Sequence, residues 1–381
     1  MKYRALIAST GLAMFSMFFG SGNLVFPILV GQLSSGHYLL ASIGILLTGV
    51  VVPFLGILAM FLFNGDQNAF FSRLGKPATF WFPLLALSLM GPFGVLARCI
   101  TVAHGAFKML SPETGLPLFS LAACAVIFML TMHKQQIVSL LGSILTPLLL
   151  ASLLAISIGA FISRDLPTTL GTGGWQSFKE GALKGYQTMD LLASFFFSVF
   201  VIRHLQSHKL TPSNPQQSIS IFMKASLVGA GLLSAIYVAL VILGAMYAPY
   251  LEQTLPQEML GAIARLALGN WAAPILSITV ILACLTTAIV LASLFADFLK
   301  KEIAKDRLPS WASLVVTLLI AFAISTLQFS GIMAFIAPIL EFTYPALIVM
   351  TMASILHKWF GLKTIRTPIA VAVLIKFLSA I

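Results

Sequence analysis

The chain has 381 residues, of which 59% are apolar and only 9% carry a charge. Soluble domains have about a quarter charged residues, so this composition excludes a soluble enzyme, a nucleic-acid binder and a disordered regulator. The net charge of +11 comes from 22 basic and 11 acidic residues. In a membrane protein, Lys and Arg mark the cytoplasmic face, so this excess does not predict a polyanionic partner.

Long apolar runs follow one another along the whole chain. A helix needs about 20 apolar residues to cross the hydrocarbon core, and these runs are too long and continuous for barrel strands. We therefore expect an all-α polytopic membrane protein with about 11 spans. The expected spans are 5–33, 37–63, 78–109, 116–133, 136–162, 181–203, 222–247, 271–299, 309–328, 331–355 and a short one at 366–381.

The distribution of basic residues predicts a cytoplasmic N-terminus, because this orientation puts fifteen of the 22 Lys and Arg residues on the cytoplasmic side. Six others lie at or near the outer face, and Arg98 lies within a span. The first span follows Met1-Lys2-Tyr3-Arg4 directly, without a short apolar region and a small-residue cleavage site. We expect this span to be retained rather than removed as a signal peptide.

The first expected span contains poor helix formers at mid-membrane depth, in the run Gly20-Ser21-Gly22-Asn23 followed by Phe26-Pro27. Unwound backbone in the bilayer is tolerated only where it is buried in protein or lines a cavity. Its amide N–H groups then form an anion site. A close helix–helix contact through the same glycines is the alternative interpretation.

A second irregularity, Gly185-Tyr186-Gln187-Thr188-Met189-Asp190, opens the sixth span. A carboxylate at membrane depth indicates a functional site, although Asp190 also fits a simple helix N-cap. Five spans begin with the first irregularity and five more with the second. Interrupted helices at corresponding places in two halves are typical of inverted-repeat transporters with a site at mid-membrane.

Three spans carry polar faces, which either bond to neighbouring helices or line a common cavity. These faces comprise Arg98, Thr101, His104 and Lys108 in the third span, Asp190, Ser194 and Ser198 in the sixth, and Thr279, Thr286, Thr287, Ser293 and Asp297 in the eighth. Two adjacent threonine hydroxyls, with carbonyls released by an unwound helix, would suit a hard alkali cation. Glu341 in the tenth span is either a proton site or the ion-pair partner of Arg98.

Four stretches together resemble the bacterial branched-chain amino acid:cation symporter family. They are Gly20-Ser21-Gly22-Asn23-x-x-Phe26-Pro27, Gly91-Pro92 leading to Arg98, Gly185-Tyr186-x-Thr188-Met189-Asp190 and Ala283-Cys284-Leu285-Thr286-Thr287-Ala288. The resemblance implies the leucine-transporter fold of the amino acid–polyamine–cation superfamily, with five-plus-five inverted repeats and broken first and sixth helices. It also implies sodium-coupled symport of leucine, isoleucine and valine across the bacterial cytoplasmic (inner) membrane.

We accordingly expect one membrane domain over residues 1–381. The first five-helix repeat would be 1–163 and the second, inverted repeat 178–355, with 356–381 forming a cytoplasmic loop and the short terminal span. The family generally has twelve spans, so the eleventh, short segment departs from its pattern. Glu341 stands where relatives are expected to carry an uncharged residue, which leaves room for a proton role or a shifted substrate preference.

The predicted substrate site lies between the two breaks. Amide N–H groups of Ser21, Gly22 and Asn23 would hold the carboxylate of an amino acid through the helix dipole. Carbonyls of Tyr186, Gln187, Thr188 and Met189 would hold its ammonium group, with Asp190 adding charge or ordering the break. The apolar walls would be Phe195, Phe196 and Ile289.

The resemblance implies a sodium ion as the coupling ion. Its ligands would be carbonyls near Gly20 and Asn23, the Ala283 carbonyl and the hydroxyls of Thr286 and Thr287. Arg98 and Glu341 are assigned to gating or coupling. We expect no cofactor and no nucleic acid, so the partners are the amino acid, sodium and membrane lipid, while the oligomeric state stays open.

Three rival functions compete with this interpretation. A proton-coupled transporter of another hydrophobic neutral amino acid, such as methionine, would use Glu341 or Asp190 as its titrating group. An ion channel is disfavoured because neither irregular segment resembles a repeated selectivity-filter loop. An enzyme is disfavoured because the chain has no phosphate loop, nucleophile elbow or HExxH motif.

Overall fold

The computed structural model describes residues 2–132, 137–163, 173–207, 215–269 and 271–361. Within these ranges every regular element is a helix, as the composition predicts. Five helices are long and apolar enough to cross a membrane. They are Tyr38–Leu62, Ala78–Phe107, Gln217–Met246, Ala273–Ile303 and Gln328–Phe360.

Two further spans are pairs of helices joined at a sharp bend. The first pair, α1 (Lys2–Phe18) and α2 (Ser21–Ser34), is bent by 74°. The second pair, α10 (Gly174–Gln187) and α11 (Asp190–Ser207), is bent by 43°. The described part of the chain thus has up to seven spans by length and composition, plus shorter apolar helices at Leu116–Met132, Leu150–Ile162 and Ser310–Ser325.

These elements coincide with the first ten expected spans, whereas the expected terminal span at 366–381 lies outside the described residues. The remaining helices are α3 (Tyr38–Leu46), η1 (Leu47–Val51), α4 (Val52–Leu62), α5 (Gln67–Phe71), η2 (Ser72–Leu74), α6 (Ala78–Met90), α7 (Val95–Phe107), α8 (Leu116–Met132), α9 (Ile137–Ser163), α12 (Pro215–Met246), α13 (Ala248–Leu251), η3 (Pro256–Glu258), α14 (Met259–Leu268), α15 (Ala272–Phe298), η4 (Leu299–Ile303), α16 (Ser310–Ser325) and α17 (Gln328–Phe360).

The structure differs from the expected spans at the start of one helix and in the segment between two others. Helix α10 begins at Gly174, before the expected start of the sixth span at 181, because its first turns are polar. Lys179 and Glu180 lie in these turns, so hydropathy alone does not detect them. Residues 248–268, between the seventh and eighth expected spans, form the short helices α13, η3 and α14.

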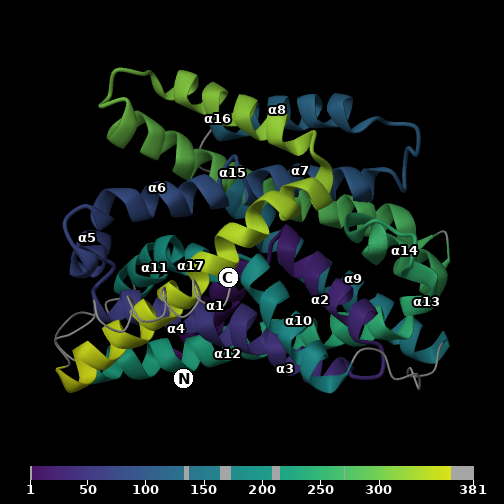
Figure 1. Ribbon diagram of the computed structural model, residues 1–381, viewed down its shortest axis with the longest axis horizontal. Helices are drawn as coiled ribbons and strands as arrows, with labels where there is room; N and C mark the ends of the chain where they lie inside the picture. The colour runs from purple at the N-terminus through teal and green to yellow at the C-terminus, as the bar shows by residue number, and fades with distance from the viewer. Residues whose placement is uncertain (1, 133–136, 164–172, 208–214, 270, 362–381) are drawn as a thin grey trace.

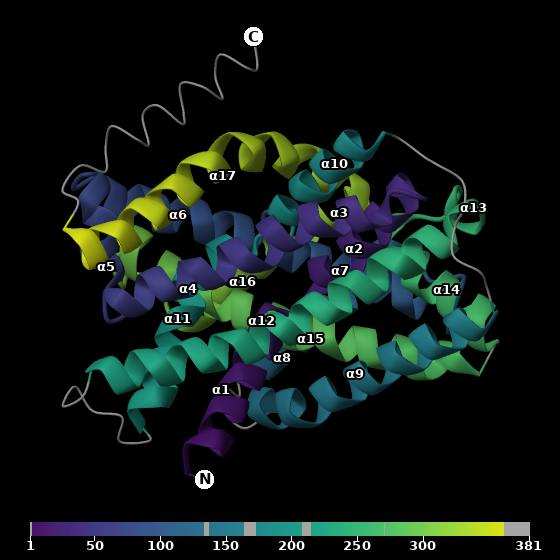
Figure 2. The same cartoon turned by 90° about the horizontal axis from the view of Figure 1, so that it is seen from below.

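The two bent pairs pack reciprocally against the helix that follows the opposite pair. Helices α1 and α2 lie along α12, whereas α10 lies along α3 and α11 along α4 (Figure 2). Glycines permit these contacts: a Cβ on Gly244 would meet the backbone of Ile28 in α2, and one on Gly181 would meet the backbone of Ala41 in α3. This exchanged packing is what the expected inverted repeat predicts, with α1–α2 corresponding to α10–α11 and α3–α4 corresponding to α12.

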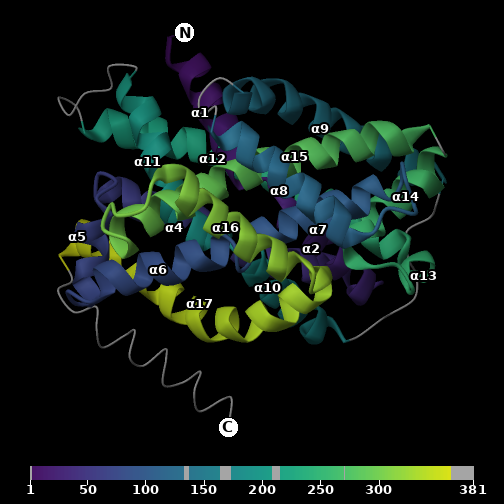
Figure 3. The same cartoon turned by 90° about the horizontal axis from the view of Figure 1, so that it is seen from above.

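Helix α15 connects the bent pairs to the outer helices. It packs against α7, α9, α8 and α16, and Figure 3 shows it beside α9. Figure 1 shows α8 and α16 together at one edge of the molecule, with α3 and α12 at the opposite edge. The two breaks therefore lie in the interior, between α12 on one side and α7 and α15 on the other.

Candidate functional site

The first break lies between Phe18 and Ser21, and polar groups of α2 order it. Gly20 is extended, and its N–H donates to Oδ1 of Asn23 over 3.1 Å. The Cys99 thiol of α7 donates to Ser21 Oγ over 3.4 Å. The bend turns the N-terminus of α2, with N–H groups that have no partner within the helix, into the protein interior.

The second break is built from larger residues. Met189 has a φ of 65°, in the left-handed region that a non-glycine residue rarely adopts. The Thr188 hydroxyl donates to the Gly185 carbonyl over 2.9 Å and accepts the Asp190 N–H over 3.4 Å. This threonine therefore ties together the two helix ends, and Asp190 begins α11 with its side chain buried.

A direct side-chain contact joins the two breaks across the protein interior. The Asn23 Nδ2 group donates to Asp190 Oδ2 over 2.7 Å and lies 2.6 Å from the Tyr237 hydroxyl oxygen. The Tyr237 hydroxyl donates to the same Asp190 oxygen over 3.3 Å. The three side chains come from α2, α11 and α12, so they fix the relative position of both breaks.

Tyr237 belongs to the contact between the two breaks, but no sequence motif identifies it. This residue is fully buried in α12, in the middle of an apolar run. A buried tyrosine hydroxyl at membrane depth needs a hydrogen-bond partner, and that requirement is the only signal the sequence offers. Which partner it finds depends on the packing of α12 against α2 and α11.

Arg98 lies in α7 with no exposed surface, and it reaches the second break rather than a carboxylate. Its Nη1 donates to the Gln187 carbonyl over 2.5 Å and its Nη2 to the Thr188 carbonyl over 3.4 Å. The guanidinium carbon lies 5.3 Å from the centre of the Phe26 ring. Among the described residues, no carboxylate lies at salt-bridge distance from Arg98.

The four carbonyls predicted to hold an ammonium group thus fall into two pairs. The Tyr186 carbonyl accepts the Met189 N–H, and the Met189 carbonyl accepts the Ala193 N–H, so both are used by the backbone. The other two, from Gln187 and Thr188, face the Arg98 guanidinium. Their assignment to the substrate stays a prediction.

Glu341 of α17 is half-buried and lies near a different cation from the one expected. Its charge acts on Lys184 of α10, which also lies near Glu180. The rings of Tyr186 and Tyr344 pack at 5.0 Å nearby, joining the same two helices. The sequence predicts that Glu341 is either a proton site or the ion-pair partner of Arg98. The structure describes both residues and has no ion pair between Glu341 and Arg98.

The residues predicted to bind sodium lie in one region where α15 faces the first break. The hydroxyls of Thr286 and Thr287 both donate to the Ala283 carbonyl, over 2.9 and 3.1 Å. A Cβ on Gly20 would lie 3.7 Å from Thr287 Oγ1, so the first break and this threonine are neighbours. Thr286, Thr287 and Ala283 thus place three oxygens together on α15, and Thr287 is the one next to the first break; their assignment to a sodium ion stays a prediction.

The predicted apolar walls are all buried but do not lie together. Phe195 packs in an aromatic cluster, with its ring 5.4 Å from Phe70, 5.8 Å from Phe71 and 6.0 Å from Phe82. Phe196 lines a cavity of about 680 Å³ between the α5 region, α6, α11 and α15. Ile289 is buried in α15. Their role as pocket walls remains a prediction.

The hydroxyl-bearing faces bond largely within their own helices. Ser194 donates to the Leu191 carbonyl over 2.6 Å, Ser198 to the Phe195 carbonyl over 3.0 Å, and Thr279 to the Ile275 carbonyl over 2.7 Å. At the end of the polar face of α7, Lys108 pairs with Glu258 of η3 over 2.8 Å. The three hydroxyls therefore satisfy carbonyls of their own helices, and only the Lys108–Glu258 pair in this set joins two elements.

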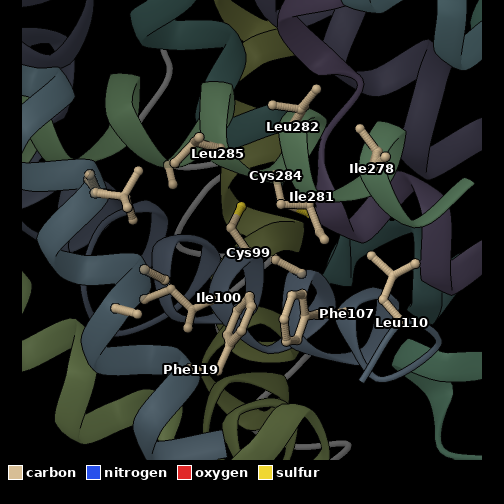
Figure 4. A pocket seen from close by; sticks show the side chains of 16 residues that line it. Cys99, Ile100, Phe107, Leu110, Phe119, Ile278, Ile281, Leu282, Cys284 and Leu285 are labelled. Atoms are coloured by element: carbon tan, nitrogen blue, oxygen red, sulfur yellow. The ribbon is translucent and has the colours of Figure 1, made fainter. Parts of the chain in front are cut away.

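An apolar cavity of about 380 Å³ lies between α7, α8 and α15. Aliphatic, aromatic and cysteine side chains line it, and Figure 4 shows Cys99 and Cys284 close together at its wall. All three cysteines of the chain are buried and free. The lining offers nothing to hold the charged groups of a zwitterion, so this cavity does not match the predicted substrate site.

The family described as branched-chain amino acid transport protein matches residues 4–381. This chain belongs to that family. The branched-chain amino acid permease BrnQ of Corynebacterium glutamicum is 29% identical over 372 residues, covering 93% of this chain and 84% of the permease. The permease BrnQ of Bacillus subtilis is 29% identical over 371 residues, covering 93% and 82%.

Solved structures of two transporters share the fold. Mhp1, a nucleobase-cation-symport-1 family transporter in a closed conformation with bound bromovinylhydantoin, superposes with a TM-score of 0.60 at 14% identity, covering 97% of this chain and 91% of Mhp1. A mutant of the Eremococcus coleocola manganese transporter gives 0.59 at 16% identity, covering 99% and 87%. This family member is therefore a polytopic membrane transporter with the leucine-transporter fold, and its relatives are permeases and carriers rather than enzymes.

Proposed function

We propose that this transporter performs sodium-coupled uptake of leucine, isoleucine and valine across the cytoplasmic membrane of a bacterium. Membership of the branched-chain amino acid transport family and the names of the BrnQ relatives support the substrate class. The bend in each of two helices supports a site at mid-membrane that opens alternately to either side.

The observation that carries the proposal is the contact between the two breaks through Asn23, Asp190 and Tyr237. A zwitterion needs positive and negative groups a few ångströms apart. The N-terminus of α2, at Ser21 to Asn23, supplies N–H groups and a positive dipole for the carboxylate. Asp190 supplies negative charge for the ammonium group. One amino acid bound between them would touch both broken helices.

Sodium coupling rests on the position of Thr287 beside Gly20, with the Thr286 hydroxyl bonded to the same Ala283 carbonyl. The two hydroxyls and the Ala283 carbonyl would hold the ion together with carbonyls of the first break. An ion bound there would order the segment that receives the carboxylate, and this shared segment would couple the two binding steps. Among the described residues no group of three or more His, Cys, Asp and Glu is arranged to hold a metal ion, so a transition-metal cargo has no support.

The orientation that we propose puts the N-terminus in the cytoplasm. The cavity lined by Phe196 then opens on the cytoplasmic side, because its wall includes residues next to the connection that carries Arg73 and Lys76. Phe196 lies six residues after Asp190 on α11, so this cavity would be the release path toward the cytoplasm.

Radiolabelled leucine uptake into proteoliposomes tests the proposal. We expect an inward sodium gradient to drive accumulation that unlabelled isoleucine and valine compete for, and an equal inward proton gradient to give none. Accumulation driven by protons alone would contradict sodium coupling and direct attention to Asp190 and Glu341. The absence of leucine accumulation under both gradients would refute the proposed substrate.

A further inference from the structure

One nitrogen atom of the Arg98 guanidinium is firmly hydrogen-bonded, whereas the other two have weak partners or none among the described residues. Nη1 donates to the Gln187 carbonyl over 2.5 Å and also contacts Met333 Sδ at 3.4 Å. Nε is buried and has no hydrogen-bond partner among the residues that the structure describes. The contact of Nη2 with the Thr188 carbonyl is long, at 3.4 Å.

Nε and Nη2 lie on the same edge of the planar guanidinium. Two parallel N–H bonds on such an edge match the two oxygens of a carboxylate, which is the strongest pairing that an arginine makes. A buried cation normally has a carboxylate partner, because leaving its charge uncompensated is costly. Within the described residues Arg98 has carbonyls, a thioether and an aromatic ring instead.

The free edge lies against the N-terminus of α2. Nη2 is 3.3 Å from the position that a Cβ on Gly22 would occupy, so the guanidinium packs directly beside the N-terminus of α2, where a side chain at residue 22 would crowd it. The first N–H groups of α2 and the guanidinium are both positive. Among the described residues no carboxylate lies within salt-bridge distance of the guanidinium, although the charge of Asp190 acts on it from farther away. This is the electrostatic arrangement of a site that awaits an anion.

We propose that Arg98 is a receptor for the substrate carboxylate, which its Nε and Nη2 would bind bidentately while the N–H groups at Ser21 and Gly22 bind the same carboxylate from α2. This inference deepens the proposed function and rests on an amino acid being the substrate. Because Nη1 remains on Gln187, the bound carboxylate connects the first break to the second through α7. Asp190 is then the charge that receives the ammonium group.

A purely structural role for Arg98 makes a different prediction. If the guanidinium only satisfies the carbonyls of the second break, its loss weakens binding of every ligand, whether or not the ligand has a carboxylate. A carboxylate receptor discriminates between leucine and leucinamide, which has the same side chain and ammonium group but a neutral amide in place of the carboxylate.

Binding of labelled leucine and its displacement by leucinamide, measured on purified protein in nanodiscs, separates these roles. We expect the wild type to prefer leucine by about 100-fold, the cost of truncating one partner of a buried charge pair. In Arg98→Met, leucine affinity falls by that factor, leucinamide affinity changes little, and the preference disappears. The control Met333→Leu removes another contact of Arg98 while keeping its charge, and it retains the preference.

Arg98→Lys keeps a buried cation, and it tests the carboxylate role of Arg98 even if Arg98→Met does not fold. Lysine is a point charge without a bidentate edge, so we expect a roughly 10-fold loss confined to leucine. Equal losses for leucine and leucinamide in either variant, or unchanged leucine affinity, overturn the carboxylate role. A wild type that binds both ligands equally also overturns it and leaves amino acid transport intact. A wild type that binds no branched-chain amino acid instead refutes the proposed substrate.

Discussion

The breaks between α1 and α2 and between α10 and α11 occupy equivalent places in the two halves, yet they have opposite chemistry. The first is bent by 74° at a glycine and presents the N-terminus of α2. The second is bent by 43° at Met189, a non-glycine residue in the left-handed region, and presents two carbonyls to Arg98. In the proposed site the first break would hold an anion and the second a cation.

The difference teaches that an inverted repeat gives two equivalent positions but not two equivalent sites. The direction of a helix sets which backbone groups its break presents at a given depth. In an inverted repeat the two directions are opposite, so N–H groups of one break face carbonyls of the other. Side chains then strengthen the asymmetry, because Asp190 adds negative charge to the second break while Gly22 keeps the first one open. A zwitterionic substrate matches this polarity.

The largest effect should come from removing the charge of the second break. Asp190→Asn keeps the shape and an oxygen acceptor for Asn23 but removes the carboxylate, so we expect kcat/KM for leucine uptake to fall by at least about 100-fold. Proteoliposome uptake with a sodium gradient measures it. If the variant binds and transports leucine like the wild type, Asp190 is only a helix cap and the charge contrast between the breaks has no functional meaning.

The double variant Thr286→Ala with Thr287→Ala removes two oxygens next to the first break. We expect the sodium concentration for half-maximal uptake to rise by about 10-fold or more, because the ion would lose ligands while the leucine site stays intact. Thr279→Ala is the matched control, since Thr279 lies on the same helix and donates to its own helix carbonyl. Unchanged sodium dependence in the double variant would remove α15 from the cation site.

Tyr237→Phe tests the contact that joins the two breaks. The change removes the hydroxyl and its bond to Asp190 while the ring still fills its place in α12, so uptake should fall by about 10-fold through loss of one hydrogen bond to a charged group. Combining this change with Asp190→Asn should add little further loss, because both act on the same charge-assisted hydrogen bond between Tyr237 and Asp190. Fully additive losses would show that Tyr237 acts independently of Asp190.

The smallest effect concerns the backbone of the second break and is measured as thermal stability in detergent. Met189→Gly should be more stable than Met189→Ala by about 1 kcal/mol, because glycine adopts a positive φ without strain. At Met350, a buried residue inside α17, the order should reverse, since alanine is the better helix former. The same order at both positions would mean that the left-handed residue is not what bends α10–α11.

Several features of the fold follow from local properties of the sequence. Apolar runs of sufficient length predict ten of the helical segments, and glycine at residue 20 with a proline at residue 27 marks the first break, because both residues are poor in a helix interior. The polar first turns of α10 escaped detection, since hydropathy does not distinguish an amphipathic helix end from a loop. The sequence pattern also does not identify Tyr237, because a single tyrosine in an apolar run forms no spacing pattern with other polar residues.

Local properties of the chain predict the class of the protein, the positions of both breaks and the identity of the charged residues near them. Those features depend on helix propensity, hydropathy and the cost of charge in a membrane, which are properties of neighbouring residues. The contact of Arg98 with Gln187 rather than Glu341 depends on tertiary packing. So does the contact of Asn23 with Asp190 and Tyr237. These pairings join residues far apart in the chain, and the packing of α2, α7, α11 and α12 sets which groups come within hydrogen-bond distance.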